Sequence, residues 1–293
     1  MTKNLFEIKN LSVHFHKNHH LIKAVDQVSF AIPAGTTVGI VGESGSGKTT
    51  TGRAIAKIGP ITSGEILFNG QSLSTFTRQQ TYQFRRQVQM VFQDPFAALN
   101  PRQKVGTTIG EGLENFHLGV NRQAREAKII DLLAEVGLPS DAINRFPHEF
   151  SGGQRQRIGI ARALAVSPKF LVLDEPISAL DVSIQAQIVN LLHNIQQQQQ
   201  LTYMFIAHDL SMVHHISDSI VVMYHGKIME TGPTQLVYHH PLHPYTQSLL
   251  SAVPHADPIY EQHKKIISFD PTNAATDGHL VEKEPQHFVL VSS

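Results

Sequence analysis

Residues 37–49, Thr-Val-Gly-Ile-Val-Gly-Glu-Ser-Gly-Ser-Gly-Lys-Thr, decide the fold class of this chain. Thr37–Val41 is short and nearly all apolar, which is typical of a strand buried in a parallel sheet. The glycines after it let the backbone curl so that its N–H groups point toward an anion, and residues 49–58 then follow a helical pattern. A strand, a glycine-rich loop and a helix in this order predict a phosphate-binding loop in an α/β fold.

Two side chains of this loop have specific predicted roles. Lys48 is placed to reach the β- and γ-phosphates of a nucleotide, and the hydroxyl of Thr49 is placed to contact Mg²⁺. The residues that we expect to bind the nucleotide are Gly42, Ser44, Gly45, Ser46, Gly47, Lys48, Thr49 and Thr50.

A second apolar strand, predicted over residues 170–174, ends in two carboxylates. Ligands of open α/β sheets bind at the C-terminal edge of the strands, where Asp174 and Glu175 would lie. We therefore predict that Asp174 holds the Mg²⁺ ion through its water shell. Glu175 is suited to orient and deprotonate the attacking water.

The segment Ser151-Gly152-Gly153-Gln154 precedes a predicted helix over residues 155–165. Ser151 suits a helix N-cap, but a cap alone does not need two glycines. Two glycines at a helix start allow the backbone to approach an anion closely. Since one compact domain does not need two phosphate-binding devices, we expect this one to serve a nucleotide held by another copy or a partner chain.

His208 follows a predicted strand over residues 203–207, and Gln93 follows one over residues 88–92. A histidine at the C-terminal edge of a sheet can hydrogen-bond a γ-phosphate and respond to its loss. Gln93 taken alone indicates nothing.

Together these segments resemble the ATPase subunit of ABC transporters over residues 5 to about 255. The resemblance implies that ATP and Mg²⁺ are the cofactors, with Glu175, His208 and Gln93 as catalytic residues and Gln93 also at the metal site. It further implies that Phe15 stacks on adenine. The resemblance also implies names for four segments: residues 42–49 are the Walker A loop, 151–154 the signature motif, 174–175 Walker B and 178–181 the D-loop. Within the D-loop, Asp181 is implied to be a nucleotide-site residue.

Five longer stretches resemble the oligopeptide/dipeptide-permease branch of that family, and two of them resemble its F-type subunit. The stretches are residues 90–102, 147–157, 178–187, 243–246 and 249–254. This resemblance implies a D-type ATPase as a heterodimeric partner, two transmembrane permease subunits and, indirectly, an extracytoplasmic peptide-binding protein. Closure of the ATPase dimer on ATP would then drive peptide import.

The domain organisation that we predict is an α/β P-loop ATPase with an antiparallel β-subdomain and an inserted helical subdomain. The RecA-like core covers about 5–93 and 165–240, the helical subdomain about 94–164, and an extension of the peptide-permease type 241–293. The proline-rich and polar composition beyond residue 241 predicts weak order over the last 25 or so residues.

Composition narrows the class of protein. The 293 residues carry a formal net charge of zero, contain no cysteine and show no basic field for nucleic acid. No apolar run approaches the ~20 residues of a membrane span. We therefore expect a soluble subunit attached to the cytoplasmic face of the membrane through its permeases. The 18 histidines cluster without a metal-ligand motif, so we predict no metal site among them.

Three alternatives remain at this point. Chromosome and repair ATPases share the signature motif, but they need a coiled coil or DNA-binding domains that this chain lacks. Ribosome-acting proteins carry two cassettes, and this chain has one. Nickel and antimicrobial-peptide transporters use nearly the same ATPase, so the transported substrate and the choice of hetero- or homodimer stay open.

Overall fold

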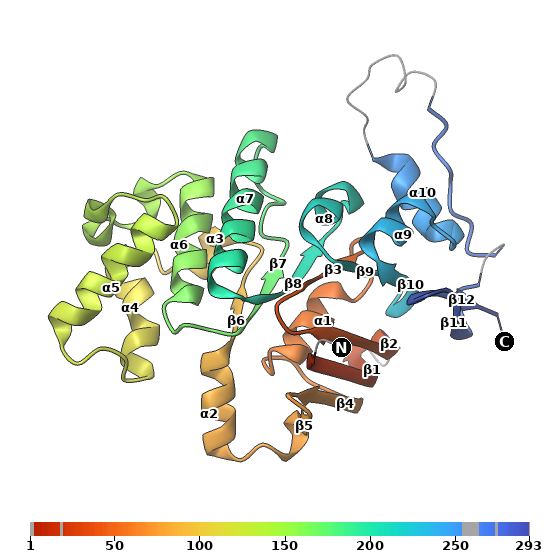
Figure 1. Cartoon of the computed structure of the whole chain (residues 1–293), viewed down its shortest axis with the longest axis horizontal. Helices are drawn as coiled ribbons and strands as arrows, with labels where there is room; N and C mark the ends of the chain where they lie inside the picture. The colour runs from red at the N-terminus through yellow and green to blue at the C-terminus, as the bar shows by residue number, and fades with distance from the viewer. Residues whose placement is uncertain (1–2, 18–19, 254–263, 273–274, 293) are drawn as a thin grey trace. The chain divides into compact units, whose positions relative to one another are not determined.

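The computed structural model describes residues 3–17, 20–253, 264–272 and 275–292 (Figure 1). The chain forms two compact units. The first comprises Met1–Thr75 together with Met204–Ser293, and the second is Phe76–Tyr203. Each unit is described by itself below. Among the described residues, no helix combines the length and the apolar character needed to cross a bilayer.

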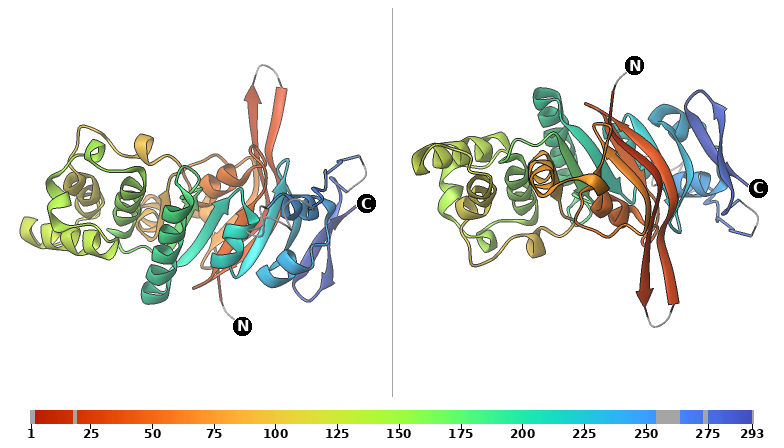
Figure 2. Two further views of the ribbon diagram at one scale, coloured as in Figure 1. Left: turned by 90° about the horizontal axis from the view of Figure 1, so that it is seen from above. Right: turned by 90° about the horizontal axis from the view of Figure 1, so that it is seen from below.

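An antiparallel sheet opens the first unit. Its strands are β1 (Asn4–Lys17), β2 (His20–Pro33), β4 (Ser63–Phe68) and β5 (Gln71–Ser72), in the spatial order β2-β1-β4-β5. This sheet is the antiparallel β-subdomain expected from the sequence, and β1 and β2 form a long hairpin (Figure 2). Asn10 has φ 48° where the β1–β2 register shifts between Ile8 and Leu11, as expected at a β-bulge.

A second sheet of this unit carries the glycine-rich loop. Its strands lie in the order β11-β12-β10-β9-β3-β8. They are β3 (Thr37–Val41), β8 (Thr202–Ala207), β9 (Ser219–Tyr224), β10 (Lys227–Pro233), β11 (His279–Glu284) and β12 (His287–Val291). The first two residues of β8 belong to the second unit. All five residues of β3 are buried, and β3 runs parallel to β9, which confirms the prediction of a buried parallel strand.

The helices of the first unit are short. They are α1 (Lys48–Ile55), the 3₁₀ turn η1 (Leu73–Thr75), α8 (Leu210–Ile216), α9 (Thr234–His239) and α10 (Pro244–Ala252). The last three were not predicted from the sequence.

The prediction of weak order at the C-terminus is wrong for residues 279–291. There β11 and β12 form an antiparallel hairpin, and β12 pairs with β10 through Glu230–Val289 and Thr231–Phe288. Val289 and Leu290 are each 6% exposed. Their apolar side chains are ordered because the edge of β10 supplies backbone partners, a long-range effect that composition does not reveal.

The second unit combines two parallel strands with helices. The strands β6 (Val88–Val91) and β7 (Phe170–Asp174) pair in parallel. The helices are α2 (Arg78–Gln87), α3 (Pro95–Ala98), α4 (Val105–Asn115), α5 (Arg122–Glu135), η2 (Ser140–Asn144), η3 (Pro147–Glu149), α6 (Gly152–Leu164) and α7 (Val182–Gln199). Helices within the predicted helical subdomain, about 94–164, were expected, whereas α2 was not. The run of five glutamines at residues 196–200 lies at the end of α7, which includes the first four of them.

Candidate nucleotide-binding site

Three glycines shape the loop between β3 and α1. Gly42, Gly45 and Gly47 have φ values of 149°, 80° and 104°, a region that other residues rarely adopt. A Cβ on Gly42 would lie 2.1 Å from the carbonyl oxygen of Met223 on β9. A Cβ on Gly47 would lie 2.3 Å from the carbonyl oxygen of Ala24 on β2. Both backbone conformation and close packing therefore require glycine at these two positions.

Lys48 lies at the centre of this loop and is only 4% exposed. Its Nζ donates to the carbonyl oxygens of Gly42 at 2.7 Å and Glu43 at 2.8 Å. The Nδ1 atom of His208 lies 3.4 Å from the same Nζ and 3.3 Å from the oxygen of Gly42. The structure thus brings Lys48 and His208 together, although 160 residues separate them.

The remaining loop residues fit a phosphate group. Ser44 and Gly45 are exposed, while Thr49 and Thr50 are half-buried at the start of α1. The buried Oγ atom of Ser46 has no hydrogen-bond partner among the described residues. A helix start, positive-φ glycines, a buried ammonium and an unsatisfied hydroxyl together suit an anionic ligand.

Two hydrogen bonds from other segments fix the backbone of the loop. The amide of Gly226, in the β9–β10 turn, donates to the carbonyl oxygen of Ser46 at 3.0 Å. The amide of Glu43 donates to the hydroxyl of Tyr245 at 3.0 Å. Tyr245 was absent from the predicted site residues. Its only sequence signal is the stretch 243–246, which indicated the permease branch but no role at the site.

In the second unit, Asp174 and Glu175 end the fully buried strand β7 as expected. Their exposed fractions are 2% and 5%. Glu175 has φ 47°, a left-handed conformation that side-chain-bearing residues adopt at a cost of ~1–3 kcal/mol and that is concentrated at functional sites. The Nε2 atom of Gln93 donates to Oε2 of Glu175 at 2.6 Å. Gln93, which indicated nothing alone, therefore contacts the predicted general base. Carboxylate and hydroxyl oxygens are ligands that suit Mg²⁺.

The helix α6 begins at Gly152 with a capping box. The Oγ atom of Ser151 accepts from the amide of Gln154 at 3.3 Å, and Oε1 of Gln154 accepts from the amide of Ser151 at 3.0 Å. A Cβ on Gly153 would lie 2.6 Å from Ile184 of α7, whereas one on Gly152 would lie 3.5 Å from Leu180. Helix packing therefore explains Gly153, whereas for Gly152 the close approach of a ligand stays a prediction.

Two further predicted residues lie on the surface. Asp181 caps the N-terminus of α7, and its carboxylate accepts from the Ser183 hydroxyl at 2.7 Å and the Ile184 amide at 3.0 Å. These bonds lower the pKa of Asp181. Phe15 lies opposite Ile22 in the β1–β2 hairpin and is 41% exposed. Its expected role against adenine stays a prediction.

The histidine clusters do not form a metal centre in the described residues, where no group of three or more His, Asp or Glu side chains is arranged to hold a metal ion. His214 instead stacks on Tyr238 with ring centroids 4.1 Å apart. Burial and the neighbouring His215 and His239 lower the pKa of His214.

A family model for the ABC transporter matches residues 25–178, and one for the oligopeptide/dipeptide transporter C-terminal region matches residues 229–278. The chain therefore belongs to the ABC transporter family and has its ATP-binding domain. This confirms the resemblance inferred from the motifs.

Three relatives make the subgroup clear. The oligopeptide transport ATP-binding protein OppF of Streptococcus mutans is 56% identical over 99% of this chain and 95% of its own length. OppF of Bacillus subtilis is 52% identical over 99% and 97%. The dipeptide transport ATP-binding protein DppF of Lactococcus lactis is 54% identical over 98% and 94%.

Solved structures agree on the fold. The cbiO1 protein of Clostridium perfringens, part of the ABC transporter complex cbiONQ, matches with a TM-score of 0.72 and 25% identity over 81% of this chain and 92% of its own. The ATP-binding cassette MJ0796, in a dimeric post-hydrolysis state bound to ADP and Pi, matches with a TM-score of 0.72 and 26% identity over 78% and 98%.

Proposed function

We propose that this chain is the ATP-hydrolysing subunit that powers import of oligopeptides or dipeptides through a membrane ABC transporter. The observation that carries this proposal is the buried ammonium of Lys48 inside a loop of positive-φ glycines at the start of α1. The similarity to OppF and DppF along nearly the whole chain supports a peptide as the transported substrate.

The first unit supplies phosphate recognition. Backbone amides at the end of the loop and the start of α1, with the charge of Lys48, hold the β- and γ-phosphates of ATP. His208, 3.4 Å from Lys48, is placed to hydrogen-bond the γ-phosphate and to respond when that group is lost. Phe15 is the proposed adenine contact.

The second unit supplies the carboxylates. Bound Mg²⁺, held by the Thr49 hydroxyl, Gln93 and Asp174, would neutralise phosphate charge. Glu175 takes the proton of the attacking water, and its left-handed backbone fixes the direction of the carboxylate. The 2.6 Å bond from Gln93 holds Oε2 of Glu175, so a change at Gln93 reorients the base.

Assembly follows from the same chemistry. We propose that residues Ser151 to Gln154 and Asp181 contact the nucleotide of a second ABC ATPase subunit, a D-type chain, so that each ATP lies between two subunits. Two permease subunits anchor the pair at the cytoplasmic face of the membrane, and an extracytoplasmic peptide-binding protein delivers the substrate. No nucleic acid is involved.

The test is ATP-dependent peptide uptake by the reconstituted complex of this chain, its D-type partner and the permeases. Lys48→Ala should abolish uptake and weaken nucleotide binding, because backbone amides cannot replace its charge. Lys9→Ala, which removes an exposed lysine of β1, is the matched control and should keep both. Unchanged ATP affinity in Lys48→Ala contradicts the site. Uptake of Ni²⁺ or an antimicrobial peptide, without oligopeptides or dipeptides, contradicts the substrate.

A further inference from the structure

One peptide group of the glycine-rich loop is held at both of its polar ends. The carbonyl oxygen of Gly42 accepts from Nζ of Lys48 at 2.7 Å and lies 3.3 Å from Nδ1 of His208. The N–H of the same peptide group belongs to Glu43 and donates to the hydroxyl of Tyr245 at 3.0 Å. Tyr245 therefore contacts one end of the same peptide group whose other end contacts Lys48 and His208.

This arrangement matters because Gly42 gives the peptide little stiffness of its own. At φ 149° a glycine has no Cβ to restrict rotation, so the orientation of the Gly42–Glu43 peptide depends on its hydrogen bonds. If the N–H loses its acceptor, the carbonyl that positions Lys48 can rotate with it, because both belong to one planar group.

Tyr245 is well suited to hold this peptide. Its side chain is fully buried, and its ring contacts the rings of Tyr224 and Phe269 at centroid distances of 4.6 and 5.1 Å. Burial raises the pKa of Tyr245, so its hydroxyl stays neutral and accepts a hydrogen bond at any physiological pH. A ring packed on two sides fixes the hydroxyl in one place.

The C-terminal extension fixes the helix that carries Tyr245. His243 caps α10: its Nδ1 accepts from the amide of Tyr245 at 3.1 Å, and its Nε2 lies 2.8 Å from the carbonyl oxygen of Ala275. The amide of His243 donates to Glu230 at 2.8 Å, and Glu230 bonds Nε2 of His287 on β12 at 2.7 Å. Glu230 and His287 are both fully buried.

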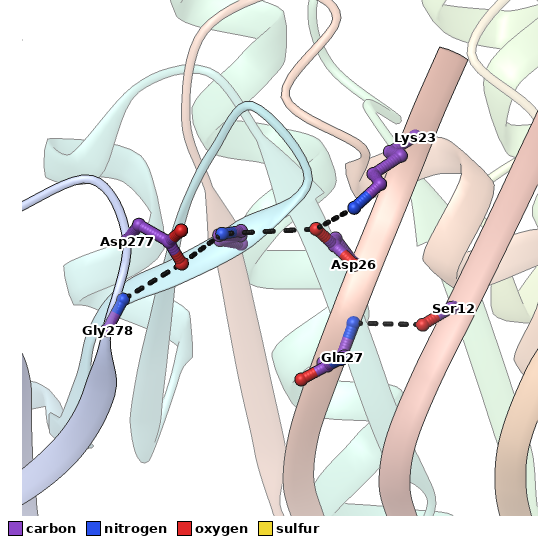
Figure 3. A network of polar contacts seen from close by, with 7 residues as sticks. Ser12, Lys23, Asp26, Gln27, Asp277 and Gly278 are labelled. Carbon is purple, nitrogen blue, oxygen red and sulfur yellow. Dashed lines mark hydrogen bonds and ion pairs between the residues drawn. The ribbon is translucent and has the colours of Figure 1, made fainter. Parts of the chain in front are cut away.

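A second tie joins the extension to the N-terminal sheet (Figure 3). Nζ of Lys227 lies 2.6 Å from Asp277, just before β11, and 3.9 Å from Asp26 on β2. Asp26 also pairs with Lys23 at 3.3 Å. The extension is thus bonded to β10 and to the loop, and Lys227 of β10 links it in turn to β2.

We propose that Tyr245 is a positioning residue of the nucleotide site, through which the C-terminal extension sets the orientation of Lys48 and with it the affinity for the triphosphate. The inference rests on the proposed function, in that the loop must bind ATP. It assigns to the extension a direct part in nucleotide binding, carried by one hydroxyl. A tyrosine that only filled the core would contribute through its ring alone.

Tyr245→Phe separates these roles, because it removes the hydroxyl and keeps the ring. Loss of one hydrogen bond to a buried amide corresponds to roughly tenfold weaker ATP binding, measured by titration with a fluorescent ATP analogue. Tyr203→Phe is the matched control: it removes another buried hydroxyl, which donates to the carbonyl oxygen of Leu192 at 3.1 Å in the second unit. The control should change ATP affinity by less than about twofold.

Hydrogen–deuterium exchange supplies the readout that a purely structural role would not move. Without nucleotide, the peptide covering residues 42–48 should exchange faster in Tyr245→Phe than in the wild type and in Tyr203→Phe. In the wild type the Glu43 amide should be protected from exchange, and this expectation can be tested without any variant. A Glu43 amide that exchanges without protection in the wild type overturns the proposal. The proposal also fails if ATP binding weakens equally in Tyr245→Phe and Tyr203→Phe, or weakens in neither.

ATP titrations of Lys48→Ala and of the wild type distinguish a failure of the proposed function from a failure of the inference about Tyr245. If the wild type binds no ATP, or Lys48→Ala binds it equally well, the proposed function fails. If the wild type binds ATP, Lys48→Ala does not, and Tyr245→Phe matches the wild type, then only the inference about Tyr245 fails.

Discussion

At the scale of single residues, the site depends on backbone conformations that most side chains avoid. Glu175 has a left-handed backbone directly after a buried strand, and Gly42 has φ 149° directly after another. Each conformation turns the chain sharply at the end of a strand, so that functional groups point away from the strand axis. The conformations persist because the surrounding hydrogen bonds fix them.

Glu175→Gln should leave ATP binding intact and lower hydrolysis by ~10²–10⁴-fold. The amide keeps the shape of the side chain but cannot accept the proton of water. Steady-state phosphate release measures the effect, with Glu126→Gln, an exposed site on α5, as the control. Turnover within a few-fold of the wild type would show that Glu175 is not the base.

Gly42→Ala should disrupt the loop, because the new Cβ would meet the Met223 carbonyl oxygen at 2.1 Å. Gly70→Ala is the control: Gly70 also has a positive φ, but nothing lies within 4 Å of its Cβ, so only ~1–2 kcal/mol of backbone strain is added. Thermal unfolding and ATP titration should both show the larger loss in Gly42→Ala. Equal losses would mean that the close approach to β9 does not constrain the loop.

At the scale of elements, helix starts carry much of the chemistry. The starts of α1 and α6 are the predicted anion sites, and the start of α10 holds Tyr245 through the cap residue His243. The cap on α10 requires an unprotonated Nδ1, because that atom accepts from an amide. A buried cap of this kind is sensitive to pH.

His243 should make stability fall in mild acid. Burial lowers its pKa below the usual 6.5, although Glu230 and the Ala275 carbonyl oppose the shift; Tyr245 is its other polar neighbour, and His287 bonds the second oxygen of Glu230. Below pH ~6.5 the unfolded chain binds a proton that the folded chain resists, so this contribution is complete above pH 6.5 and is lost as pH falls toward the lowered pKa.

The measurement is the midpoint of thermal unfolding between pH 7.5 and 5. Asparagine is also a good N-cap and does not titrate, so His243→Asn should lose less stability than the wild type over this range. His279→Asn, at an exposed position of β11, should follow the wild type. Parallel curves for wild type and His243→Asn would contradict the assignment.

At the scale of the whole molecule, the residues proposed for the nucleotide site are distributed over both units. The first unit contains the glycine-rich loop and His208, and the second contains Glu175, Gln93 and the capped start of α6. The start of α6 contributes amides and an exposed Ser151 side chain. We expect this surface to act on the nucleotide of the partner chain.

Gly152→Asp should weaken nucleotide binding at the loop of a wild-type D-type partner and leave binding at Lys48 of the same chain intact. A Cβ at Gly152 makes only an ordinary 3.5 Å contact, so the effect should come from charge repulsion. Gly152→Asn, of equal shape and no charge, is the matched control. Nucleotide crosslinking to each chain of the mixed dimer reads the two sites separately. Loss at the chain's own loop alone would contradict action in trans.

The sequence by itself determined the features that are local. The buried strand β3, the glycine-rich loop, the carboxylates after β7 and the capped start of α6 all follow from the order and spacing of neighbouring residues, because their conformations depend on glycine geometry, burial and capping within a few positions. The overall class of fold followed from the order of these segments.

Only the tertiary structure decided the contacts between distant segments. His208 meets Lys48, Gln93 meets Glu175, and Tyr245 meets Glu43 across 160, 82 and 202 positions of the chain. The hairpin of β11 and β12 is ordered because β10 offers an edge, although its composition predicted weak order. Such contacts depend on where the strands of a sheet bring the chain, and no local pattern encodes the partner of a side chain that lies one or two hundred residues away.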